Sequence, residues 1–134
     1  PLELKSIGEN IFYPKKIGDE RDFQVIIDTG LFDIYKDITS RTKNLGFGGE
    51  KMSGGQRQII NLFRAILSKK DIILLDEPTS ALDEKNRKII YKMISSMIKL
   101  NKTIIISTHD PELIKLGQKI IKMNKGKIEK ITNS

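Results

Sequence analysis

Two acidic residues and the only histidine of the chain stand at or just after the ends of apolar runs. Asp76 and Glu77 follow the apolar run at residues 72–75. His109 stands two residues after a second run, Thr103–Ser107. Short unbroken apolar runs of this kind are typical of parallel strands buried on both faces. Open α/β sheets bind their ligands at the carboxyl ends of such strands, so we expect these three side chains at one edge of a sheet.

A second candidate for chemistry is the segment Ser53-Gly54-Gly55-Gln56, which stands directly before a helical apolar pattern. Ser53 can cap the free amides of the first helical turn. The two glycines let a large ligand approach the backbone. Together they form an electropositive helix start that suits a phosphate. Taken alone, the segment could equally be a plain turn that opens a surface helix.

The same caution applies to the other candidates when each is considered alone. An Asp-Glu pair after a strand is often a solvated turn, and an isolated histidine is often a surface residue. Only the joint occurrence of the segments, in this order and at this spacing, favours a functional interpretation.

Strands and helices alternate around these residues. Apolar periodicity predicts helices over residues 56–68 and 84–100, the second capped by Ser80 or Asp83. The inner face of the second helix is predicted to hold Ile89, Ile90, Met93, Ile94, Met97 and Ile98. Together with the two apolar runs, this helix predicts a βαβ unit.

Shorter elements are expected on either side. One short helix begins at Asp19 or Asp22, holds Phe23, Ile26 and Ile27, and ends at Gly30. A second spans residues 31–38, and a third lies between Pro111 and Gly117. Residues 119–123 and 127–131 predict a terminal antiparallel hairpin. The first fourteen residues show little periodicity, although Ile7, Ile11 and Phe12 could pack.

Composition narrows the class of protein. The chain has 134 residues, of which 38% are hydrophobic and 31% charged, as in ordinary globular domains. It has no cysteine, which excludes disulfides and thiolate metal sites. The net charge of +7 could suit nucleic acid or an anionic membrane surface. The lysines are scattered among isoleucines, however, which favours solvated faces, and we expect no nucleic-acid partner.

The segments resemble, in order and spacing, those of the ATP-binding (nucleotide-binding) domain of ABC transporters. Residues 52–56 are similar to the family signature, with Met52 where leucine is usual, and residues 72–77 to the Walker B strand with its glutamate. Residues 108–110 carry the switch histidine. The family's D-loop is matched by Ser80-Ala81-Leu82-Asp83.

This resemblance implies roles in ATP hydrolysis. Asp76 would hold Mg²⁺, because a hard cation prefers oxygen ligands. Glu77 would polarise the attacking water as general base. His109 would hydrogen-bond the γ-phosphate and hold the geometry of water and glutamate.

The resemblance also implies a partner. Ser53, Gly54 and Gly55 would grip the γ-phosphate of an ATP held mainly by a second nucleotide-binding domain, in a head-to-tail dimer. Gln56 would support this loop, and Asp83 would contact the opposite site across the same interface. Transmembrane domains of a transporter would be further partners, and the chain would lie at the cytoplasmic face of a membrane.

Parts of the family pattern are missing. The sequence contains no Gly-x-x-x-x-Gly-Lys-Ser/Thr run, the Walker A loop that cradles phosphates. The family's Q-loop would fall before Pro1. The fold implied is a partial P-loop NTPase: residues 1–58 from the helical signature subdomain, and residues 59–134 from the C-terminal part of the ATPase core. We expect this fragment to bind ATP weakly, not to hydrolyse it alone, and to leave an unpaired strand edge or an uncovered apolar face.

The subclass indicated is an exporter-like transporter. Residues 6–11 resemble the exporter segment after the Q-loop, and Gly46 and Gly49 match glycines that exporters carry before the signature. Phe47 departs from the exporters' usual glutamate. Two alternatives stay open: a non-transport ABC ATPase acting on nucleic acid or the ribosome, and a non-catalytic half-site used for dimerisation. Gln56 argues against the first, and intact Glu77 and His109 argue against the second.

Overall fold

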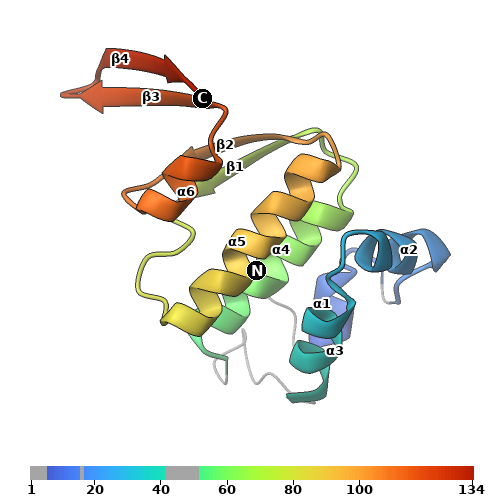
Figure 1. Ribbon diagram of the computed structural model, residues 1–134. Coiled ribbons are helices and arrows are strands. Elements are labelled where there is room, and N and C mark those ends of the chain that lie inside the picture. The colour runs from blue at the N-terminus through green and yellow to red at the C-terminus, as the bar shows by residue number, and fades with distance from the viewer. Residues whose placement is uncertain (1–5, 16, 42–51) are drawn as a thin grey trace.

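The computed structural model describes residues 6–15, 17–41 and 52–134. Its helices are α1 (Ile7–Ile11), α2 (Glu20–Asp28), α3 (Phe32–Arg41), α4 (Gly54–Leu67), α5 (Glu84–Lys99) and α6 (Pro111–Leu116). Its strands are β1 (Ile72–Asp76), β2 (Thr103–Ser107), β3 (Lys119–Asn124) and β4 (Lys127–Asn133) (Figure 1). The predictions for Gly46, Phe47 and Gly49 fall outside the described residues. None of the described helices combines the length and apolar character that crossing a membrane requires.

The predicted βαβ unit is confirmed. β1 and β2 pair in parallel, from Ile72 opposite Thr103 to Asp76 opposite Ser107, and α5 is the crossover helix between them. Asp83 caps α5, as expected: its side chain accepts a hydrogen bond from the Asn86 amide over 2.8 Å.

The two-stranded sheet has one covered face and one open face. Ile73 is buried on the face toward α4 and α5, and Leu75, Ile104 and Ile106 pack against the same core. On the other face Ile72, Leu74 and Ile105 are 63%, 72% and 57% exposed. The prediction that both faces of these strands are buried is therefore wrong for this chain, and the expected uncovered apolar face is confirmed.

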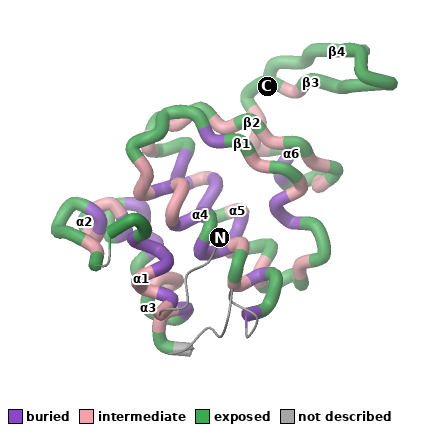
Figure 2. Tube along the Cα trace, turned by 180° about the vertical axis from the view of Figure 1, so that it is seen from behind, coloured by how far each residue is buried: buried purple, intermediate pink, exposed green. Residues whose placement is uncertain are grey.

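α4 and α5 form the centre of the core (Figure 2). The fully buried positions of α5 are Ile90, Met93, Ile94 and Met97, which follow helical spacing. Ile89 is only partly buried. Ile98 is 36% exposed, so its predicted place on the inner face is wrong. Ile98 follows Met97, the last fully buried residue of α5, and lies at the margin of the buried face.

The helix α1 was not predicted, because five residues are too short to show a period. The Ser6 side chain caps it by accepting from the Glu9 amide, and the Ser6 amide donates to the Glu9 carboxylate, which completes a capping box. The apolar residues Ile7, Ile11 and Phe12 are buried, as expected. The predicted boundary after residue 58 lies inside α4, and the division into two parts stays a prediction.

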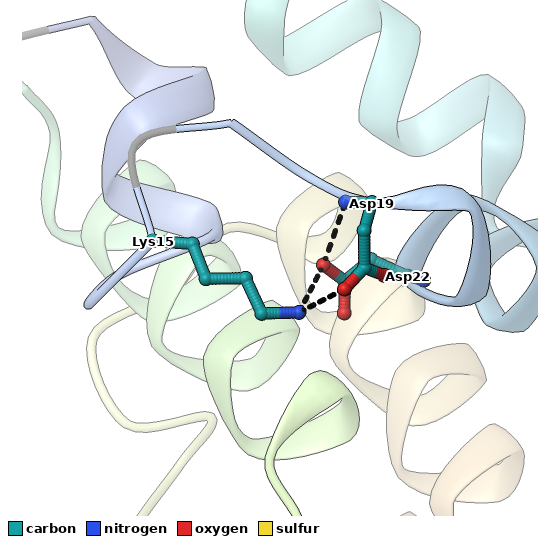
Figure 3. Close-up of polar contacts among 3 residues, drawn as sticks. All are labelled: Lys15, Asp19 and Asp22. Atoms are coloured by element: carbon teal, nitrogen blue, oxygen red, sulfur yellow. Dashed lines mark hydrogen bonds and ion pairs between the residues drawn. The ribbon is translucent and has the colours of Figure 1, made fainter.

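Helix α2 begins at a charged cap. Asp19 and Asp22 exchange hydrogen bonds with each other's backbone amides, and the Lys15 ammonium lies 2.6 Å from Asp19 and 2.9 Å from Asp22 (Figure 3). Gly30 follows the helix in the left-handed region, at φ +70°, as its predicted place at the helix end requires. The helix holds Phe23, Ile26 and Ile27 as predicted; Ile26 is fully buried, whereas Ile27 is 54% exposed.

The C-terminal hairpin is confirmed. β3 and β4 pair in antiparallel fashion around a turn that contains Gly126, whose φ is +76°. The hairpin projects from the helices and the β1–β2 sheet, and most of its residues are exposed (Figure 2).

Candidate functional site

β1 and β2 end side by side, which brings the predicted acidic residues and histidine to one sheet edge. The Glu77 amide donates to the Ser107 carbonyl over 2.9 Å, which adds one hydrogen bond beyond the last residue pair of β1 and β2. His109, two residues after β2, places its Nε2 3.5 Å from Glu77 Oε1. The expected placement at one edge is confirmed, while the roles of Asp76, Glu77 and His109 stay predictions.

Glu77 has an unfavourable backbone conformation. Its φ of +42° lies in the left-handed region, which costs a residue other than glycine about 1–3 kcal/mol. A conformation of this kind persists only where neighbouring contacts determine it. The Glu77 side chain is 34% exposed and the His109 side chain 98% exposed, so an incoming ligand can reach both.

A hydrogen-bond network adjoins this pair at Asp110, the residue after His109. One carboxylate oxygen of Asp110 accepts hydrogen bonds from the Thr79 hydroxyl and from the Tyr91 hydroxyl, each over 2.7 Å. The other carboxylate oxygen accepts a hydrogen bond from the Glu112 amide over 2.9 Å, so Asp110 also caps α6. Burial opposes ionisation of Asp110, but the Tyr91, Thr79 and backbone hydrogen bonds outweigh it and hold the pKa of this carboxyl below its usual range.

Ser53 caps α4 as predicted, and Gln56 completes the cap. The Gln56 amide donates to Ser53 Oγ over 3.1 Å, and the Ser53 amide donates to Gln56 Oε1 over 2.9 Å. The first turn of α4 carries no acidic residue. Ser53 and Gly54 are exposed, so the partly positive helix start is open to an anion.

The two glycines of this segment have different surroundings. A Cβ at Gly54 would meet no atom within 4 Å, whereas a Cβ at Gly55 would lie 2.8 Å from the Asn86 side chain. Gly55 therefore lets the start of α4 approach the start of α5. Gln56 and Asp83 also line one small cavity of about 130 Å³.

The D-loop residues connect the two regions. Ser80, Ala81, Leu82 and Asp83 run from the turn after β1 to the start of α5. Ala81 has a positive φ of +56°, and Leu82 packs against the core. The signature segment thus lies beside Asp83, while Asp76, Glu77 and His109 lie at the ends of the strands near α6 (Figure 1).

The acidic residues at the carboxyl end of β1 suit one kind of metal site. Within the part of the chain that the structure describes, no three carboxylate, histidine or cysteine side chains form a cluster that could hold a metal ion by protein ligands alone. Mg²⁺ commonly keeps several waters and binds one or two carboxylates together with substrate phosphates. The exposed carboxylate of Asp76 suits a site completed by such a substrate.

Sequence reasoning gave the hydrogen-bond network of Asp110 no role. Asp110 was identified only as part of the segment 108–110, and Tyr91 and Thr79 were not singled out. Their separations of 19 and 31 residues from Asp110 follow no helical or strand period. Only the fold brings them together.

Comparison with known proteins identifies relatives for this arrangement. A family model described as ABC transporter matches residues 5–80. The macrolide export ATP-binding/permease protein MacB of Bradyrhizobium diazoefficiens is 37% identical over 60% of the chain, which corresponds to 12% of that relative. An ATP-dependent lipid A-core flippase of Desulfotalea psychrophila is 42% identical over 63% of the chain and 14% of its own length.

The fold has a solved counterpart. A bacterial Atm1-family ABC exporter with ATP bound matches 98% of the chain with a TM-score of 0.73 and 24% identity. The chain spans 23% of that protein and about an eighth of the curated relatives named above. The expected fold, a part of the P-loop NTPase fold of ABC proteins, is therefore confirmed.

Proposed function

Since the chain belongs to the ABC transporter family, we propose that it forms part of an ATP-binding subunit that couples ATP binding and hydrolysis to transport across a membrane. The observation that carries this proposal is the 3.5 Å approach of His109 to Glu77 at the carboxyl ends of two parallel strands. The relatives are named as export and flippase proteins, which supports an exporter-like subclass.

In the proposed reaction Glu77 acts as general base toward the attacking water. Phosphoryl transfer to water depends mainly on positioning and on neutralising charge. His109 donates to the γ-phosphate and keeps the water in line with Glu77. Mg²⁺, held through Asp76, would neutralise the charge of the phosphates.

The signature segment acts in trans in this proposal. Its open helix start lies beside Asp83, away from the pair formed by Glu77 and His109. One copy of this region would therefore bind the γ-phosphate held by a second nucleotide-binding domain, with Ser53, Gly54 and Gly55 as donors. Gln56 stabilises this loop through the capping box.

The cellular setting follows from the same proposal. The subunit works at the cytoplasmic face of a membrane, with transmembrane domains and a second nucleotide-binding domain as partners. The 134 residues contain no phosphate loop, so we expect them to bind ATP weakly and to show no turnover by themselves.

Replacing the proposed base tests the assignment. In the transport protein that contains this chain, Glu77→Gln keeps the shape of the side chain but removes the base, and we expect kcat to fall by about 10²–10⁴-fold. The matched control is Glu84→Gln, which changes an exposed glutamate that pairs with Lys88 and should leave turnover unchanged. Retained turnover in the Glu77 variant would contradict the proposed role.

A further inference from the structure

The carboxylate of Asp110 joins three elements behind the proposed catalytic pair: the turn after β1, the loop after β2, and helix α5. We propose that Asp110, with Thr79 and Tyr91, forms a positioning network that fixes Glu77 opposite His109. This inference rests on the proposed function of Glu77 and His109.

The covalent and hydrogen-bonded connections around the pair form a closed loop. Thr79 lies two residues after Glu77, and Asp110 lies one residue after His109. The bond from the Thr79 hydroxyl to Asp110 therefore closes the gap between the two loops on the side opposite the β1–β2 ladder. Hydrogen bonds to an ionised carboxylate are about twice as strong as neutral ones. Thr79 is only 6% exposed, so little water competes for its hydroxyl.

The strained backbone of Glu77 needs this kind of support. On one side, the Glu77 amide is bound to Ser107. On the other side, the Glu77 carbonyl accepts the Ser80 amide over 3.1 Å, and Thr79 within this turn is bound to Asp110. Without the Thr79 bond, the turn would be free to relax its positive φ. The Glu77 carboxylate would then move away from His109.

Tyr91 extends the network to helix α5. Its hydroxyl donates to the same oxygen of Asp110, and its ring lies two turns after Asp83, the cap of that helix. The segment from Glu77 to Asp83 is therefore connected to α5 at two points. Its last residue, Asp83, caps α5, and Thr79, near its first residue, is linked to Tyr91 of α5 through Asp110. A displacement of α5 would reach Glu77 through both connections.

Single hydroxyl removals test the network in the transport protein that contains this chain. Thr79→Val and Tyr91→Phe each delete one donor to Asp110 and keep the shape of the side chain. We expect kcat to fall about tenfold or more in each, because small misplacements of a catalytic group cost up to about 10²-fold. KM for MgATP should stay within about twofold, and Thr79→Ser, which keeps the hydroxyl, should restore kcat. Matched controls are Thr103→Val and Tyr13→Phe, which alter exposed residues elsewhere.

The outcomes separate this inference from the proposed function. If Glu77→Gln abolishes turnover while Thr79→Val and Tyr91→Phe keep the wild-type kcat, the network has no positioning role and the inference is overturned. It is also overturned if Thr79→Ser loses as much kcat as Thr79→Val, or if KM changes in parallel with kcat. If Glu77→Gln keeps full turnover, the proposed function fails instead.

A second measurement tests the network without turnover. In the transport protein that contains this chain, Thr79→Val should speed hydrogen exchange of the Ser80 amide about tenfold or more, because that amide closes the turn at Glu77. Thr79→Ser should exchange at the wild-type rate. Equal exchange in Thr79→Val and the wild type would show that the bond to Asp110 does not hold the turn.

Discussion

At the start of α4, two adjacent glycines meet different physical demands. Gly54 is exposed and faces open space, whereas Gly55 is buried against Asn86 of α5. The sequence identified both as ligand-approach positions and gave no means of separating them. The difference depends on which helix packs across the second glycine, which the local sequence does not specify.

This difference predicts opposite outcomes for two alanine substitutions. Gly55→Ala should lower the free energy of unfolding by about 1–3 kcal/mol, because its Cβ would overlap the Asn86 side chain. Gly54→Ala should change it by no more than about 0.5–1 kcal/mol, and in the stabilising direction, because alanine restricts the unfolded chain more than glycine does. Urea unfolding of both variants measures this, and equal losses would contradict the close approach of α4 to α5.

Local rules predicted other single residues correctly. Ser53 and Asp83 cap their helices, and Gly30 takes the left-handed conformation, φ +70°, that follows α2. Each depends on bonds or angles within a few residues. Asp110 could not be identified in this way, because its two hydroxyl partners come from elements that only the tertiary fold brings near it.

At the scale of elements, Arg64 of α4 links that helix to α1 by hydrogen bonds. Arg64 donates from Nε to the Asn10 carbonyl and from its terminal nitrogen to Asn10 Oδ1, and its guanidinium lies 5.2 Å from the centre of the Tyr13 ring. An aromatic cluster continues this contact through Phe12, Phe23, Tyr35 and Phe63. The sequence predicted α4 but not α1, because a five-residue helix is defined by its cap and its contacts.

Arg64→Lys should therefore loosen the contact between α1 and α4. A lysine cannot supply the two directed donors or the planar contact with Tyr13. We expect the free energy of unfolding to fall by about 1–3 kcal/mol, measured by urea titration. The control, Arg87→Lys on the exposed side of α5, should show no loss. A loss of the same size in both variants would mean that Arg64 is not a specific link.

At the scale of the whole molecule, the open face of the β1–β2 sheet is an exposed apolar surface. Its residues Ile72, Leu74 and Ile105 lie over a covered core, so the sheet has helices on one side alone. The parallel pairing was predictable from two apolar runs separated by a helix. Which of the two faces would be covered was not, because both faces of each run are apolar in sequence.

This face should cause the 134-residue chain to self-associate. Replacing Leu74 and Ile105 together by serine should lower the weight-average sedimentation coefficient at a given protein concentration, because exposed apolar patches drive association. Sedimentation velocity measures this coefficient. Ile17→Ser is a suitable control, because Ile17 is 78% exposed but lies in a loop away from the sheet. Equal effects of the two changes, or none from the double variant, would exclude the sheet face as the contact.

The terminal hairpin has a consequence for how the chain is degraded. Ser134 bonds back to Gln118 and Gly117, at the base of the hairpin, and the residues beyond that base are largely exposed. A two-stranded hairpin with no covering layer is marginally stable. Proteases should therefore reach the lysines around its tight turn while the α4–α5 pair is still intact, and trimming at the C-terminal end should precede any loss of the helical signal.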